Sequence, residues 1–156
     1  IRGGDLGGDQ FVARPLCYSK GFVCASPEYV AEHGGLNQIE ELEKHSCLLY
    51  RNALVPNRWS VTDEDGTLRS ITISGAFSAN NGSALTRFAL AGMGVIYQPD
   101  FLVSKYIESG ELVNLLPKCK GYELCFYAIY PQRKLMSRKT RLLLDFLQEK
   151  LANIQF

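Results

Sequence analysis

The sequence predicts an α/β fold in which helices alternate with the strands of a largely parallel sheet. Residues 80–99 are the clearest evidence, because a polar turn, a short helix closed by Gly92 and a brief apolar strand closed by Pro99 follow one another there. Other short apolar runs alternate with segments of helical periodicity. With 156 residues, 46% hydrophobic and 21% charged, the chain is long enough for one well-cored domain or two small lobes.

The first fifty residues predict three strands and two short helices after a glycine-rich loop. Ser26 followed by Pro27 is a typical helix start, with serine as the cap and proline at the first helical position. Asn37 is the expected cap of the second helix. The loop is residues 1–10, the strands are residues 11–16, 22–25 and 47–50, and the helices are residues 28–33 and 38–44.

The remainder predicts a hairpin, further strands and three helices. Residues 63–66, at the centre of the hairpin, are rich in Asp, Glu and Gly, as expected of a turn. Ser137 is expected to cap the last helix, in which Leu142, Leu143, Phe146, Leu147 and Leu151 form one apolar face. The hairpin is residues 55–72, the helices lie before Gly92, at 101–109 and after Ser137, and the extended segments are 93–97, 112–116 and 124–130.

Charge and composition exclude several classes of function. A formal net charge of +1 gives no field that attracts nucleic acid, so this chain alone is not expected to bind DNA. No apolar run approaches the length of a membrane span, and no signal peptide opens the sequence. Because the chain starts at Ile1 inside what resembles a strand and turn, we expect a fragment of a longer protein. From the lack of a membrane-span pattern and of a signal peptide, we expect that protein to be cytoplasmic and not associated with a membrane.

The cysteine pattern favours reduced thiols. Five cysteines are widely spread without a Cys-x-x-Cys pair, which argues against a disulfide framework. Four of them lie in apolar runs, where a free cysteine usually behaves as a small buried hydrophobe. Cys119 lies in a polar turn between Lys118 and Lys120, and lysines there could lower its thiol pKa. A redox-sensing thiol is thus one interpretation of Cys119, and a buried, inert thiol is the favoured one.

Catalytic and cofactor motifs are missing from the sequence. His33 and His45 each follow or end a short helix, without a serine or cysteine in a nucleophile motif nearby. Residues 63–65 carry three carboxylates, but in a hairpin turn they are most simply a solvated tip. We find no phosphate-binding glycine motif and no metal-ligand spacing. The sequence therefore predicts neither an enzyme nor a cofactor or metal site.

Two features point to a small-molecule site. Asn80 or Asn81 can cap the helix that follows, and free amides at a helix start next to a sheet can bind a carboxylate or phosphate. An ordinary α/β unit with nothing bound fits the same pattern. Trp59, the single tryptophan, has arginine and asparagine neighbours, which is typical of a ligand pocket and equally of a hairpin core.

Several short blocks together resemble the LysR-type transcriptional regulators. The blocks occur in the family's order and cover most of the chain. They are IRGGDL (1–6), VARPL (12–16), CASPEY (24–29), NNGSAL (80–85), AGMGV (91–95), QPDF (98–101) and YAIYP (127–131). Each block is weak alone, and their shared register makes the resemblance specific.

The resemblance implies the effector-binding portion of such a regulator, built like a type 2 periplasmic binding protein with two α/β lobes joined by two crossing strands. Residues 1–16 and 121–156 would be the remnant of an incomplete first lobe, and residues 17–120 the second lobe. DNA would be bound only through a helix-turn-helix domain that this chain lacks. The family also implies a homo-oligomer, such as a dimer.

The resemblance further implies a small effector, an anion or aromatic acid, held between the lobes. The wall contributed by the second lobe would be Tyr50, Arg51, Asn52, Trp59, Asn80, Asn81 and Gly82. A solute-binding protein or an enzyme on the same fold is the alternative, because fold does not determine function.

Overall fold

The computed structural model describes residues 1–4, 11–131 and 137–151. Most of the predicted loop at 1–10 therefore lies outside the described residues. The chain divides into two compact units, one made of residues 1–19 and 123–156 and the other of residues 20–122. We call them unit 1 and unit 2. Among the described residues, no helix is both long and apolar enough to span a bilayer.

Unit 2 is built on a mixed sheet, which corrects the expectation of a largely parallel one. Its strands are β2 (Phe11–Ala25), β3 (Cys47–Tyr50), β6 (Gly75–Ala79), β7 (Val95–Pro99) and β8 (Val113–Asn114). The last residues of β2 pair antiparallel with β7 and β8, whereas β3 pairs parallel with both β7 and β6. Alternation of strands and helices does not reveal strand direction, and β2 runs opposite to its neighbours in unit 2.

β2 is one strand of 15 residues, where the sequence predicted two separated by a break. The chain stays extended at Gly21 because a neighbouring segment lies against it. A Cβ at this position would come within 2.6 Å of the Tyr122 ring and 2.8 Å of the Tyr97 ring. Glycine is therefore required here by close packing, and its presence does not mark a turn.

The helix starts and stops agree largely with prediction. The Ser26 hydroxyl accepts from Tyr29 N at 3.2 Å at the start of α1 (Pro27–His33). Gly92 and Gly110 follow α2 (Gly82–Leu90) and α3 (Asp100–Glu108) with φ of +74° and +80°. The predicted helix at 38–44 is instead a 3₁₀ helix, η1 (Ile39–Lys44), and Gln38 takes the cap position expected for Asn37. The backbone N–H of Asn37 donates to the Glu41 carboxylate at 2.7 Å.

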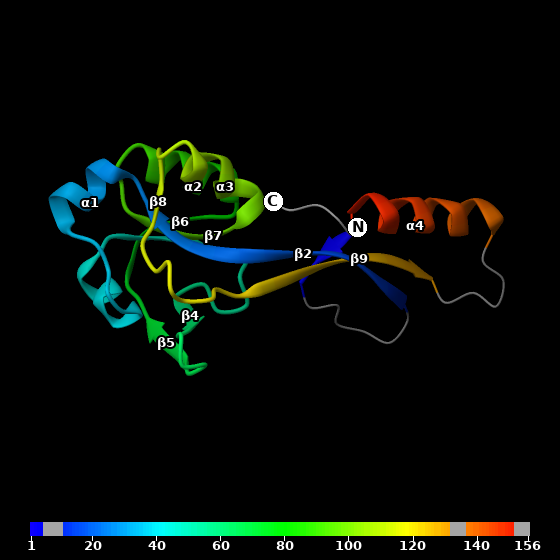
Figure 1. Ribbon diagram of the computed structural model, residues 1–156, viewed down its shortest axis with the longest axis horizontal. Coiled ribbons are helices and arrows are strands. Elements are labelled where there is room, and N and C mark those ends of the chain that lie inside the picture. Colours follow the sequence, from blue (N-terminus) through cyan, green and yellow to red (C-terminus); the bar gives the residue numbers. More distant parts are fainter. Residues whose placement is uncertain (5–10, 132–136, 152–156) are drawn as a thin grey trace. The chain divides into compact units, whose positions relative to one another are not determined.

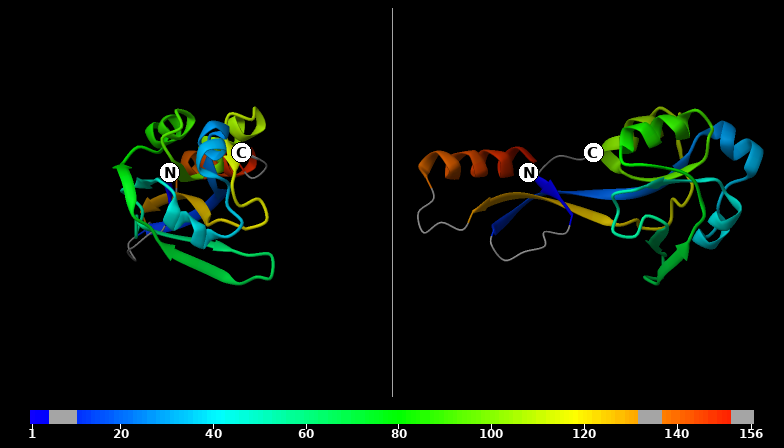
Figure 2. Two further views of the ribbon diagram at one scale, coloured as in Figure 1. Left: turned by 90° about the vertical axis from the view of Figure 1, so that its left-hand side faces the viewer. Right: turned by 180° about the vertical axis from the view of Figure 1, so that it is seen from behind.

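Two apolar layers cover the two faces of this sheet. α2 and α3 pack on one face through Leu85, Ala89 and Val103. The hairpin of β4 (Arg58–Thr62) and β5 (Leu68–Thr72) covers the other face together with α1 and η1. Figures 1 and 2 show α2 and α3 on one side of the sheet and the hairpin on the other. The predicted hairpin is confirmed, with Trp59 paired to Ile71, whereas β6 is a strand that the sequence did not reveal.

Unit 1 contains a small antiparallel arrangement and one helix. β1 (Arg2–Gly3) pairs antiparallel with β9 (Glu123–Pro131), which lies beside β2 in the strand order. α4 (Arg138–Leu151) follows, and the Ser137 hydroxyl accepts from Thr140 N at 3.1 Å, as predicted. Figure 1 and the right-hand view of Figure 2 show this helix alongside β9.

The buried side of α4 differs from the predicted apolar face. Leu144 is buried against Leu16 and Ala128, with Leu147 and Leu151 packed beside it. The other three residues of the predicted face are exposed, namely Leu142, Leu143 and Phe146. The helix has apolar residues over more than half of its circumference, so periodicity alone could not tell which side meets the strands.

Candidate functional site

The carboxyl ends of β7, β3 and β6 lie at one edge of the unit 2 sheet, because these three strands run parallel. In open α/β sheets, ligands bind outside the carboxyl ends of the strands. Residues following β3 and β6 meet there, since Arg51 N donates to Ala79 O at 2.8 Å. We call this set of residues the carboxyl edge: Tyr50, Arg51, Asn80, Asn81 and Gly82.

The first turn of α2 supplies hydrogen-bond donors to the carboxyl edge. Asn81 caps the helix, with its side-chain oxygen accepting from Ala84 N at 3.2 Å. The amides of Gly82 and Ser83 belong to the same turn, where helical N–H groups have no acceptor within the helix. The first turn carries no acidic side chain, so the positive end of the helix dipole is not neutralised locally.

Arg51 adds the one positive charge of the carboxyl edge. Its guanidinium is exposed and donates to the Ser78 carbonyl at 3.4 Å and the Ser78 hydroxyl at 3.3 Å. These neutral acceptors leave the charge available for a carboxylate, for which a planar guanidinium is well suited. Asn52 and Asn80 are also exposed, and Tyr50 is half-buried beside the α2–α3 layer.

Trp59 lies apart from the other predicted site residues. It is 5% exposed in the hairpin layer, and its ring packs on Tyr97 with 5.5 Å between centroids. The Tyr97 side chain points to the hairpin face, and the side chain of the next residue in β7, Gln98, points to the α2–α3 face, because side chains alternate along a strand. Of the two interpretations of Trp59, the structure favours the core indole.

Two buried polar residues, one in β7 and one at the start of α3, were not singled out from the sequence. Gln98 is 3% exposed, and Asp100 is 8% exposed. The Asp100 carboxylate accepts from Lys20 N at 2.9 Å and from Phe101 N at 2.8 Å. The signal that could have revealed Gln98 is its position as the one polar side chain at the end of an otherwise apolar strand.

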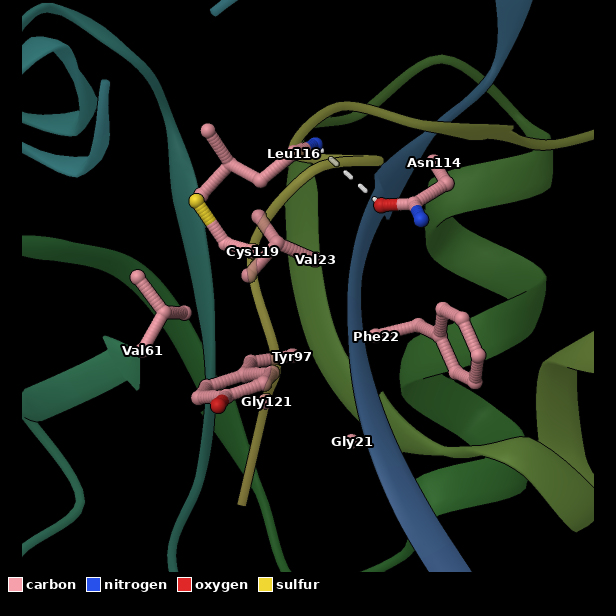
Figure 3. Close-up of a pocket in the computed structure, with 9 residues that line it drawn as sticks. All are labelled: Gly21, Phe22, Val23, Val61, Tyr97, Asn114, Leu116, Cys119 and Gly121. Atoms are coloured by element: carbon pink, nitrogen blue, oxygen red, sulfur yellow. Dashed lines mark hydrogen bonds between the residues drawn. The ribbon is translucent and has the colours of Figure 1, made fainter. Parts of the chain in front are cut away.

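A small cavity lies on the hairpin side of the sheet, away from the carboxyl edge. Val23, Val61, Tyr97, Leu116 and Cys119 contribute to its lining (Figure 3). Its internal space of about 10 Å³ corresponds to a single water molecule. This cavity is too small for an effector, so we place the candidate site at the carboxyl edge.

Cys119 does not have the reactive character that its lysine neighbours suggested. Burial raises the pKa of its thiol, and the hydrogen bond to the Asp63 carboxylate at 3.4 Å raises it further. The raised pKa argues against the redox-sensing interpretation of Cys119 and agrees with the favoured one of an inert thiol, because the charged group that contacts the thiol is negative. Across the residues that the structure describes, no group of three or more metal-ligating side chains is present.

A family model for the LysR substrate binding domain matches residues 1–152. The chain belongs to this family. Its fold is accordingly that of the LysR regulatory domains, a periplasmic-binding-protein-like α/β architecture with a mixed sheet. The family resemblance and the fold class inferred from the sequence are both confirmed.

The relatives of this LysR domain are transcriptional regulators. The chain is 37% identical over 154 residues to the HTH-type transcriptional regulator CrgA of Neisseria meningitidis serogroup B, covering 98% of this chain and 51% of CrgA. It is 31% identical to the HTH-type transcriptional regulator DmlR of Escherichia coli, covering 97% of this chain and 49% of DmlR. The chain thus spans about half the length of these relatives.

A solved structure of the CrgA regulatory domain is also similar to this LysR domain. The two superimpose with a TM-score of 0.79 at 37% identity, covering 95% of this chain and 72% of that one. The chain is therefore a ligand-binding regulatory domain of the LysR type, in whole or in part.

Proposed function

We propose that this chain senses a small carboxylic acid, aliphatic or aromatic, and thereby regulates transcription through a DNA-binding domain elsewhere in the same protein. In this proposal unit 2 is the second effector-binding lobe, and unit 1 belongs to the first lobe. The proposed site is the carboxyl edge with Asn52, and Trp59 acts as a core residue of the hairpin.

The observation that carries the proposal is the convergence of donors at the carboxyl edge. Amides of the first turn of α2, the Asn80 side chain and the Arg51 guanidinium all come from loops after parallel strands. Each donor favours a negative acceptor, and Arg51 adds a charge-assisted hydrogen bond. A carboxylate is the smallest common group that satisfies this combination.

Transcriptional control is supported over the alternative of a solute-binding protein or an enzyme. CrgA and DmlR are both named as HTH-type transcriptional regulators. An effector would alter promoter activity by binding one conformation of the domain more tightly than another.

The proposal is tested in a complete regulator that carries this chain, with a promoter reporter and succinate or benzoate as the added acid. Asn81→Ala is expected to abolish the acid-dependent change in transcription while DNA binding is retained. Loss of the cap also costs about 1 kcal/mol of stability, so Asn81→Ser, which preserves a capping oxygen, is measured beside it.

The two Asn81 variants separate ligand binding from capping. If Asn81→Ser responds like the parent while Asn81→Ala does not, the asparagine serves only as a cap. Asn37→Ala is the matched control, because the Asn37 side chain is exposed and remote from the carboxyl edge. A normal response from both Asn81 variants and from Arg51→Ala would show that the effector binds elsewhere.

A further inference from the structure

Gln98 has a buried side chain whose amide nitrogen lacks a hydrogen-bond partner within the described ranges. The residue is 3% exposed at the end of β7. Among the described parts of the chain, its Nε2 is the buried side-chain nitrogen or oxygen that lacks a hydrogen-bond partner. An unpaired buried amide destabilises a fold, because the group loses its bonds to water and gains none in exchange.

The amide of Gln98 lies against the first residue of α2. A Cβ on Gly82 would lie 2.8 Å from Gln98 Oε1 and 2.7 Å from a methyl carbon of Leu102. Glycine at position 82 therefore leaves room for the glutamine amide beside the helix start. The flanking residues Asn81 and Ser83 are exposed, so this turn is accessible from solvent.

Two independent features thus meet at one place. The first turn of α2 offers backbone amides and a helix dipole that favour an anion. The adjacent Gln98 offers a further donor, its amide nitrogen Nε2. The terminal torsion of a glutamine side chain is broad and roughly two-fold, so a half-turn exchanges the positions of Nε2 and Oε1 and brings Nε2 next to the helix start. A ligand oxygen at this turn would satisfy the backbone amides and the glutamine together.

We propose that Gln98 is a recognition residue of the effector site, whose Nε2 donates a hydrogen bond to a carboxylate oxygen bound at the first turn of α2. This inference rests on the proposed function and adds to it a specificity-determining residue. It also explains the polar side chain at the end of an apolar strand. A ligand without a carboxylate would leave the buried Gln98 donor unpaired, so the site would bind such a ligand less tightly.

The experiment uses the 156-residue chain with succinate and benzoate as probes and sodium chloride at matched ionic strength. Binding is followed by ¹⁵N NMR, in which Gln98→Leu identifies the side-chain amide signals of Gln98. We expect an acid to shift these signals together with the backbone amides of Gly82 and Ser83. In Gln98→Leu the dissociation constant should rise by about ten- to a hundredfold, the equivalent of one hydrogen bond to a charged group.

Stability without ligand distinguishes recognition from a structural role. Gln98→Leu should melt at the same temperature as the parent or higher, because leucine removes an unpaired polar group of similar size. Gly82→Ala tests the same contact from the other side, since its methyl group displaces the glutamine amide and should weaken acid binding. Gln38→Leu, at an exposed glutamine of unit 2, is the matched control and should change neither property.

Each other outcome counts against a specific statement. If Gln98→Leu binds the acids like the parent while Asn81→Ala and Arg51→Ala do not, the role of Gln98 is wrong and the proposed function stands. A lower melting temperature of unliganded Gln98→Leu, with unchanged acid affinity, would assign the glutamine a structural role. If the parent binds neither acid, the carboxylate site and the role of Gln98 both fail.

Discussion

At the scale of single residues, Tyr29 connects the two histidines of the chain. Its hydroxyl accepts from Ser46 N at 2.9 Å, and it lies 3.3 Å from His45 Nδ1. The Tyr29 hydroxyl can donate its own proton to His45 Nδ1 when that nitrogen carries no proton. The His33 ring stacks on Tyr29 with 4.3 Å between centroids. The tyrosine ring therefore lies against both imidazoles, with 5.8 Å between its centroid and that of His45.

The His45 environment predicts a pH-dependent stability. Burial lowers the pKa of His45, and the neighbouring His33 and Lys44 lower it further, whereas Glu41 opposes them. Below the unfolded value of about 6.5, the unfolded chain binds a proton that the native chain does not. The free energy of unfolding should therefore fall as the pH decreases from about 6.5 through the lower native pKa.

Urea unfolding between pH 8 and pH 5 measures this effect. His45→Gln removes the titrating group, so the variant should lose less stability than the parent over the acidic part of the range. Equal pH dependence in both proteins would show that His45 does not contribute.

At the scale of elements, Tyr97 joins the hairpin and the segment before β9 to the sheet of unit 2. Its hydroxyl donates to Ser60 O at 2.7 Å and accepts from Tyr122 N at 2.8 Å. Burial raises the pKa of Tyr97 to about 12, so the hydroxyl stays protonated and keeps both bonds at physiological pH.

Tyr97→Phe should lower the free energy of unfolding by about 1–3 kcal/mol, because the Ser60 carbonyl and the Tyr122 amide lose their partner. Urea unfolding followed by the fluorescence of Trp59, the single tryptophan, reports on this region directly. Tyr106→Phe, on α3 and half-buried, is the control and should have little effect. An unchanged midpoint in Tyr97→Phe would show that the two bonds contribute nothing net.

At the scale of the whole molecule, α4 carries large apolar side chains on its exposed side. Leu142, Leu143 and Phe146 are 60%, 56% and 54% exposed. Their spacing places them on one side of the helix. Apolar groups gathered on a surface are typical of interaction sites, so we expect the chain to self-associate through this helix.

Light scattering over a range of protein concentrations tests self-association. The average mass should rise with concentration for the parent and rise less for Leu143→Glu combined with Phe146→Glu. Lys139→Glu, an exposed change on the same helix, controls for added negative charge. A parent that remains monomeric at high concentration would contradict this prediction.

The candidate site was only partly accessible from the sequence. The Asn80–Gly82 turn stood out because a cap, a glycine and helical periodicity are signals that a few adjacent residues carry. Gln98 was missed, because its significance depends on Gly82, which lies next to it only after α2 folds onto the sheet. Trp59 could not be placed from its neighbours in sequence, since the side of a hairpin that faces the sheet depends on packing.

The sequence by itself determined the family, the alternation of strands and helices, and the helix starts at Ser26 and Asn81. Those features depend on hydrogen bonds and periodicity within a few residues. Only the tertiary structure decided the antiparallel entry of β2, the buried side of α4 and the contact of Gln98 with α2. Such features depend on strand direction and on packing between distant segments, which local preferences do not specify.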